Sequence, residues 1–432
     1  MTLEDNLMVN RFIEVMGASK YKTCRILSPL RFFMTPSIDR VIILADESAN
    51  WKIAGLRQLH RIILALDEFA KSTTPESKVD IFIFWRPDMS IEERSQPQSP
   101  PLARCRFLER IESPSVGGRE RIFNTRLLVK RRGLDEFIHE SLTVERDQAF
   151  TEESQSWQKL WQQVEEACRQ PRVSKTELSW RYVEGCWEIA RCERWLIHGS
   201  GKSRDGFVSR YLNRPISRTV SRFLVKTSIT PNLWTVLITV FPMIGFLFLI
   251  RGTYSGFVIG AALFNLHSIL DGCDGEIARA KYLDSEKGPG VDAIGDLISL
   301  LLFSIGLGFG LFRSAQPQTV SQCVFLSEGV LAFVFIAWRL VPDHVLDLLR
   351  RGPAAVVFTQ DDDRLRRSGE RFFGDRLTSW GFELTKRDVA FFVFLIAIAL
   401  GLARWILHLL FIYALATFIL SWRGRAGGKT MV

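Results

Sequence analysis

Four aspartates lie in one short stretch of this chain, at a spacing that suits a shared role. Asp271 and Asp274 are three residues apart, and Asp292 and Asp296 are four residues apart. On a helix, each spacing places both carboxylates on one face, so two facing helices would bring all four acids together. Converging carboxylates repel one another unless cations lie between them, and oxygen ligands favour hard ions such as Mg2+ or Mn2+. The spacing therefore predicts a metal site at all four aspartates, with Mg2+ or Mn2+ as the cofactor and two ions expected.

The residues between the aspartates add features of a phosphate site. Gly275 and Ala278 share the face of the first aspartate pair and leave space for a flat ligand against the backbone. Arg279 supplies a planar fork of donors that suits phosphate. Together with the metal site, these residues predict a site for a nucleotide diphosphate. The competing explanations are a solvated helix face or cap, and an ion pathway through a membrane.

The whole stretch resembles the signature of the CDP-alcohol phosphotransferase family, D-x2-D-G-x2-A-R-x8-G-x3-D-x3-D, with every fixed position filled. The resemblance implies a membrane enzyme that transfers a substituted phosphate group from a CDP-alcohol to an acceptor alcohol and releases CMP. It also implies that Asp296 is the general base as well as a metal ligand, and that a homodimer forms through the membrane helices. The nucleotide-binding residues that it implies are Asp274, Gly275, Ala278, Arg279, Gly288 and Asp292. The alternatives are a catalytically inactive nucleotide- or lipid-binding membrane protein, and an ion transporter, whose acids would be spread through the bilayer.

Long apolar segments dominate residues 233–432. A bilayer is crossed by about twenty apolar residues, and six segments qualify: 233–250, 255–270, 291–312, 320–338, 388–403 and 405–422. They predict an all-α polytopic membrane domain with six transmembrane helices. The second segment runs into the first aspartate pair and the third begins at the second pair, so the acids are expected at one membrane face. Only Arg404 separates the last two segments, which indicates either a tight helical hairpin or segment ends that lie a few residues away from these bounds.

The distribution of basic residues predicts the orientation in the membrane. Residues 339–387 and the C-terminal tail are rich in arginine and lysine, whereas the other short loops are not. The positive-inside rule then places both termini, the soluble domain and the active site on the cytoplasmic side of the inner membrane. A net charge of +9 fits a membrane lipid partner, and no basic module with stacking aromatics points to nucleic acid. Residues 357–376 are expected to form a solvated interfacial loop and helix.

Residues 202–232 form an amphipathic segment ahead of the first span. Arginines recur at every fourth position, at Arg210, Arg214 and Arg218. Such a segment is expected to lie on the bilayer surface, divided into two pieces at Pro215. These arginines either anchor the segment to anionic lipid or bind the phosphate of an acceptor such as inositol phosphate. The donor is left open between CDP-diacylglycerol and a soluble CDP-polyol.

Residues 1–201 show the pattern of a soluble α/β domain. A strand at 39–46, an amphipathic helix at 51–71 and a strand at 78–85 predict a parallel sheet. This half resembles the nucleotidyltransferase domain that precedes the membrane domain in di-myo-inositol-phosphate-phosphate synthase-like proteins. That domain needs a glycine-rich phosphate loop directly after the first strand, whereas here no glycine follows until Gly55. We therefore expect a degenerate nucleotidyltransferase-like domain that performs no nucleotidyl transfer.

Overall fold

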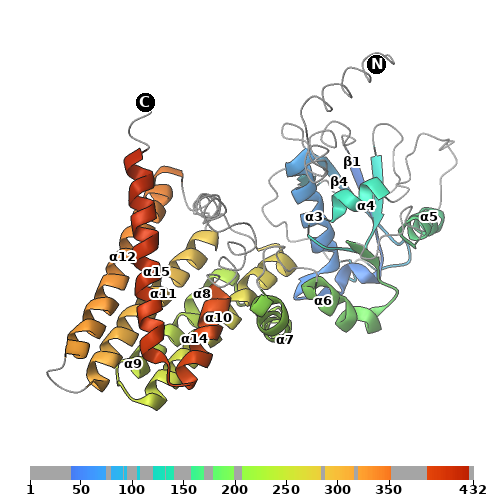
Figure 1. Cartoon of the computed structure of the whole chain (residues 1–432). Coiled ribbons are helices and arrows are strands. Elements are labelled where there is room, and N and C mark those ends of the chain that lie inside the picture. The colour runs from blue at the N-terminus through green and yellow to red at the C-terminus, as the bar shows by residue number, and fades with distance from the viewer. Residues whose placement is uncertain are drawn as a thin grey trace, which may run out of the picture. The chain divides into compact units, whose positions relative to one another are not determined.

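The chain folds into an α/β unit and a mostly helical unit, as the computed structural model shows (Figure 1). The structure describes residues 40–73, 79–90, 92–94, 105–107, 120–131, 133–140, 157–169, 179–198, 207–283, 288–315, 320–351 and 387–427. One compact unit comprises residues 1–51 and 58–184, and the other comprises residues 52–57 and 185–432. The loop and helix expected at residues 357–376 lie outside the described ranges. The domain boundaries expected after residues 201 and 232 stay predictions.

A parallel sheet forms the centre of the first unit. Its strand order is β5-β4-β1-β6, with β1 (Arg40–Ala45), β4 (Val79–Trp85), β5 (Cys105–Phe107) and β6 (Glu120–Asn124). All three pairings are parallel. Residues 41–45 of β1 are buried, as expected for a parallel strand that is covered on both faces. The predicted N-terminal α/β region is therefore confirmed.

The helix expected at residues 51–71 begins later than the sequence suggested. Residues 52–57 form a short hairpin of β2 (Lys52–Ile53) and β3 (Leu56–Arg57), and α3 spans Gln58–Thr73. The turn places Ala54 at φ 50° and Gly55 at φ 75°, a left-handed conformation that a continuing helix cannot contain. The hairpin belongs to the second unit, whereas the first unit also contains β7 (Leu127–Val129), β8 (Trp180–Tyr182), α4 (Leu134–Glu140) and α5 (Trp157–Arg169).

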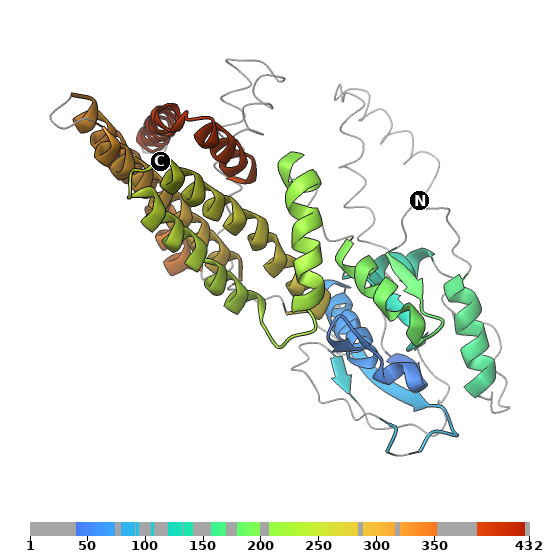
Figure 2. The same ribbon diagram turned by 90° about the horizontal axis from the view of Figure 1, so that it is seen from below.

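The second unit consists of helices that pack side by side (Figures 1 and 2). In chain order they are α6 (Ile189–His198), α7 (Arg214–Leu224), α8 (Pro231–Ile238), α9 (Val240–Leu249), α10 (Tyr254–Lys281), α11 (Gly288–Ser314), α12 (Val320–Arg351), α14 (Arg387–Ala399) and α15 (Ala403–Gly427). Helices thus occupy all six of the predicted apolar segments.

Three stretches of this unit are long and apolar enough to cross a bilayer, namely Pro231–Leu249, Tyr254–Lys281 and Gly290–Ser314. Gln322–Trp338 and Ala403–Ile419 are shorter apolar helices. Within the described ranges, the structure thus indicates a membrane protein with three candidate spans. The number of six transmembrane helices stays a prediction.

The predicted division at Pro215 is wrong. A π-helical turn over Ser209–Asn213 leads directly into α7, and the Arg214 N–H donates to the Ser209 carbonyl five residues earlier. Proline in the first turn of a helix removes an N–H that has no obligatory partner there, so the helix continues through Pro215. This bond over five residues, in place of four, is the mark of a π-bulge, in which one extra residue is inserted into a helical turn.

Aromatic rings and small residues hold the bundle together. Phe264 of α10, Phe303 of α11 and Phe391 of α14 contact one another, with ring centroids 5.1, 5.5 and 5.8 Å apart. Where α11 crosses α12, a Cβ on Gly308 would lie 2.7 Å from the Gly329 Cα. Small residues at such a crossing let the two backbones approach closely. The core therefore fixes α11 relative to three other helices.

The hairpin expected near Arg404 is present between α14 and α15. Gly401 has φ 80°, and its N–H donates to the Ile398 carbonyl at 2.9 Å. The Leu402 N–H donates to the Ala397 carbonyl at 2.8 Å. These two bonds and the left-handed glycine form a Schellman motif, which ends α14 and reverses the chain.

Candidate active site

Two long helices divide the signature between them. Asp271, Asp274, Gly275, Ala278 and Arg279 lie on α10, and Gly288, Asp292 and Asp296 lie on α11. Helix α10 continues for 28 residues without a break and ends at Tyr282, which has a left-handed conformation with φ 56°. The Leu283 N–H closes this end by donating to the Ala278 carbonyl at 3.0 Å. The first aspartate pair therefore belongs to the last turns of one helix, and the second pair to the first turns of the next.

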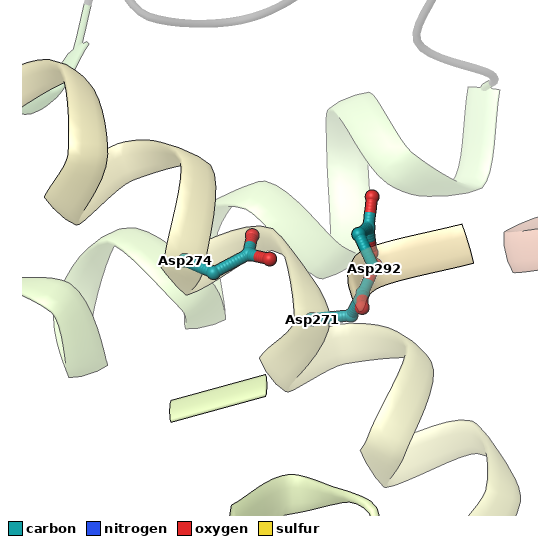
Figure 3. A group of neighbouring side chains, drawn as sticks. All are labelled: Asp271, Asp274 and Asp292. Carbon is teal, nitrogen blue, oxygen red and sulfur yellow. The ribbon is translucent and has the colours of Figure 1, made fainter. Parts of the chain in front are cut away.

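Three of the four aspartates come together. Asp271 and Asp274 of α10 and Asp292 of α11 each offer a carboxylate oxygen, and these oxygens all lie within 4.8 Å of one another (Figure 3). All three residues are partly buried. Asp271 Oδ1 and Asp292 Oδ1 are shielded from solvent and accept no hydrogen bond from the described residues. Buried carboxylate oxygens without donors fit a hard divalent cation such as Mg2+ or Mn2+.

The fourth aspartate has an arginine as its partner. The guanidinium of Arg387, the first residue of α14, contacts Asp271 Oδ2 and Asp296 Oδ1. The side chains of Arg387 and Asp296 are about one quarter exposed, at 25% and 26%. Sequence reasoning did not select Arg387, because it lies 116 residues from Asp271 and belongs to no motif. Its position opposite the acids comes from the packing of α14 against α10.

Threonine and tryptophan side chains of α8 fix the first aspartate pair. Thr235 Oγ1 donates to Asp274 Oδ2 at 3.0 Å, and Thr235 is 4% exposed. Trp234 Nε1 donates to the carbonyl of Leu270, next to Asp271, at 3.0 Å. Hydrogen bonds of this kind orient ligand carboxylates in metal sites. Helix α8 therefore supports the acids, a role that no sequence pattern predicted.

The space that the sequence predicted over Gly275 is covered by a side chain of the signature itself. A Cβ on Gly275 would lie 2.9 Å from a terminal guanidinium nitrogen of Arg279, so this side chain folds back over the glycine. Ala278 is 8% exposed, and Gly288 is the first residue of α11. The nucleotide-binding roles of these residues stay predictions.

The three candidate acceptor arginines lie in different environments. Arg214 is buried, and one terminal nitrogen lies 3.2 Å from Glu276 Oε1 on α10. Ser217 Oγ donates to the same carboxylate oxygen at 2.9 Å. Arg218 lies 3.3 Å from His198 Nδ1, and Arg210 is exposed. The guanidinium of Arg214 thus already has a carboxylate partner, and the acceptor-binding role of all three arginines stays a prediction.

The first unit has a filled polar cluster where a nucleotidyltransferase would have its phosphate loop. Asp46, directly after β1, is 2% exposed and lies 3.0 Å from two guanidinium nitrogens of Arg126. Its carboxylate also accepts from the Ser48 N–H at 2.9 Å and from Thr125 Oγ1 at 3.2 Å. Protein donors therefore surround this carboxylate. The degenerate nucleotidyltransferase-like character of the domain stays a prediction.

The helical unit contains a domain of the CDP-alcohol phosphatidyltransferase family, a family of transferases. The family model matches residues 228–362, which include the complete signature.

Three curated relatives carry the description bifunctional IPC transferase and DIPP synthase. The relative from Thermococcus kodakarensis is 38% identical over 151 residues, 33% of this chain and 34% of the relative. That from Archaeoglobus fulgidus is 38% identical over 154 residues, 35% of this chain and 29% of the relative. That from Aquifex aeolicus is 32% identical over 137 residues, 31% of each.

The similarity is confined to one part of the molecules. The chain matches about a third of the length of these curated relatives. The comparisons therefore confirm the family inferred from the signature and leave the substrates of the whole protein to proposal.

Proposed function

We propose that this protein is an integral membrane CDP-alcohol phosphotransferase. The observation that carries the proposal is the convergence of Asp271, Asp274 and Asp292 from two apolar helices, within the part that matches the family. In this function a hydroxyl of the acceptor attacks the β-phosphorus of the CDP-alcohol. The bond from the β-phosphorus to the bridging oxygen breaks, and CMP leaves. The product is a phosphodiester, in a phospholipid or in a soluble polyol compound.

Each signature residue has a defined task in this reaction. Asp271, Asp274, Asp292 and Asp296 would hold Mg2+ or Mn2+, expected as two ions, which neutralise the charge on the diphosphate. Asp296 shares the guanidinium of Arg387 with Asp271 and would take the proton of the attacking hydroxyl. Gly275, Ala278 and Gly288 leave room for the cytidine, and Arg279 binds phosphate through its fork of donors.

The acceptor is proposed to be an alcohol that itself carries a phosphate, such as inositol phosphate. Arg210 and Arg218 supply positive charge on the segment ahead of the first span, and Arg214 lies between them. The relatives are described as an IPC transferase and DIPP synthase, which fits a polyol acceptor or donor. CDP-diacylglycerol and a CDP-polyol are the two candidate donors, because the signature residues serve only the shared CDP group.

The proposed setting is the inner membrane, with six transmembrane helices and the active site and soluble domain on the cytoplasmic side. The excess of basic residues in the segments next to the acid-bearing helix ends supports this orientation. A homodimer in contact with membrane lipid completes the proposal. The N-terminal unit would serve as a scaffold, because within its described residues the loop after β1 is filled by the cluster around Asp46 and Arg126.

The test is CMP release, followed by mass spectrometry. The purified protein is incubated with Mg2+ or Mn2+, a panel of CDP-alcohols and candidate acceptors. Asp296→Asn should abolish transfer and leave CMP binding measurable, because the proton acceptor is lost while the converging carboxylates of Asp271, Asp274 and Asp292 remain. Asp88→Asn, at an exposed aspartate of the N-terminal unit, is the matched control and should leave turnover unchanged. Unchanged turnover in Asp296→Asn would refute the general-base role. Nucleotide binding without any CMP release would favour an inactive binding protein.

A further inference from the structure

Arg387 lies where a cation is least expected on helix grounds. It is the first residue of α14, and the positive end of a helix dipole disfavours arginine there. The neighbouring Asp388 is the residue that suits this end, and its Oδ2 accepts from the Ser209 N–H at 2.9 Å. Asp388 thereby fixes the start of α14 against the turn before α7. The position of Arg387 therefore needs a partner other than its own helix.

That partner is the acid cluster. The guanidinium contacts Asp271 Oδ2 on α10 and Asp296 Oδ1 on α11, so it joins the two helices that divide the signature. Arg387 and Asp296 are only about one quarter exposed, and Asp271 is 14% exposed. Charge-assisted bonds in such a partly buried place are strong. A planar fork can bridge two carboxylates at once, which an ammonium group does less well.

The proposed metal site uses the same two carboxylates. Asp271 belongs to the trio whose oxygens converge, and Asp296 is the fourth acid of the signature. A carboxylate oxygen that accepts from a guanidinium is not free to bind a divalent ion in the same direction. A guanidinium carries one positive charge and a divalent ion carries two, so the divalent ion is attracted more strongly to the same carboxylates.

We propose that Arg387 is a built-in counter-cation that bridges Asp271 and Asp296 in the metal-free protein and is displaced when a divalent metal binds. The proposal rests on the proposed metal site. Arg387 is then a positioning residue: it keeps α10 and α11 together without metal and releases Asp296 for proton transfer once metal is bound. Metal binding and the freeing of the base are thereby coupled.

The test measures metal affinity and stability of the full chain in detergent, without substrate. Free Mn2+ is followed by electron paramagnetic resonance during a titration, and thermal unfolding is recorded in EDTA and in saturating Mn2+. The variants are Arg387→Gln, which removes the charge, and Arg387→Lys, which keeps the charge and loses the two-carboxylate fork. Arg313→Gln is the matched control, because Arg313 is exposed near the last turn of α11.

Displacement predicts opposite effects on affinity and on apo stability. Arg387→Gln should bind Mn2+ about tenfold more tightly, since one charge-assisted competitor is gone. It should also unfold at a lower temperature than the wild type in EDTA and at a similar temperature in saturating Mn2+. Arg387→Lys should share both effects in part, and Arg313→Gln should show neither.

Other results would overturn the inference in distinguishable ways. Unchanged Mn2+ binding in Arg387→Gln would mean that the arginine does not compete with the metal. Weaker binding would mean that the arginine orients the ligands alongside the metal. Tighter binding in Arg387→Gln with wild-type behaviour in Arg387→Lys would reduce the effect to simple charge repulsion. If the wild type binds no Mn2+ and Asp271→Asn changes nothing, the proposed metal site itself fails. CMP release that needs Mg2+ or Mn2+ would keep the proposed function even where the displacement fails.

Discussion

Replacing either partner of the buried pair between Arg214 and Glu276 should destabilise the helical unit strongly. The Glu276 side chain is 0% exposed and that of Arg214 is 10% exposed, at a separation of 3.2 Å. Removal of one partner leaves the other charge buried, which costs about 3–5 kcal/mol. We therefore expect Glu276→Met to lower the free energy of unfolding by about that amount, and Arg214→Met by a similar amount.

The double variant separates the pair from its parts. Arg214→Met with Glu276→Met leaves no buried charge, so its stability should return to within about 1–2 kcal/mol of the wild type. Unfolding is followed by thermal and denaturant titrations in detergent, and the coupling energy comes from the double-mutant cycle. The control is Arg86→Met, which breaks an ion pair with Asp88 whose carboxylate is 69% exposed and should cost about 0–1 kcal/mol.

Two results would refute this reasoning. A cost below about 1 kcal/mol for both single variants would show that the pair is solvated. A double variant as unstable as the sum of the singles would show that the two residues act independently. CMP release by the double variant decides the acceptor role of Arg214. A KM for the acceptor close to wild type would make Arg214 structural, and a large rise in that KM would support phosphate binding.

Three further variants probe the site, the helix packing and the thiols. Thr235→Val removes the hydrogen bond to Asp274 and should weaken Mn2+ binding about tenfold in the same titration. Gly310→Ala should destabilise by at least about 2 kcal/mol in thermal unfolding, because its Cβ would lie 2.1 Å from a carbonyl oxygen of α9. Burial raises the pKa of the Cys168 thiol to about 12, so little thiolate exists at pH 8 and maleimide should label it at least about a hundredfold more slowly than the exposed Cys186.

Each of these predictions has a matched control. Thr239→Val removes a hydroxyl that donates to the backbone carbonyl of Thr235 and not to an aspartate, so the affinity for Mn2+ should be unchanged. Gly295→Ala meets its nearest atoms at 3.7 Å, an ordinary contact, and should be tolerated in unfolding experiments. Maleimide should label both cysteines at similar rates in denaturant. Equal effects of a variant and its control, or rapid labelling of folded Cys168, would contradict the corresponding prediction.

The convergence of three aspartates followed from local geometry. Helical spacing determines the face on which Asp271 and Asp274 lie, and the apolar segments placed both acid pairs near helix ends. These relations involve residues that are close in sequence, so they could be read from it. The hairpin was also expected from the short interval between two apolar runs, although the turn lies at Gly401, inside the segment predicted at 388–403, and not at Arg404.

The partner of Asp296 could not be predicted in this way. Arg387 reaches the acids through the packing of α14 on α10, over a separation that carries no periodic signal. Pro215 shows a different limit of prediction from sequence. Proline breaks a helix in its interior but not in its first turn. The π-helical turn at Ser209–Asn213 places Pro215 in the first turn of α7, and the sequence pattern did not reveal this turn. The late start of α3 depended on the left-handed turn at Ala54 and Gly55, which the amphipathic pattern concealed.

The division of the signature between α10 and α11 has a consequence for biogenesis. Neither helix alone contains a complete acid cluster, so a chain whose spans have inserted but not yet packed cannot assemble the reaction centre. Ion binding at the proposed metal site would then add to the energy that brings the two segments together, as for any ligand that recognises only the folded state. Immature copies in the membrane would thus be unable to consume an activated nucleotide precursor before their helices are correctly arranged.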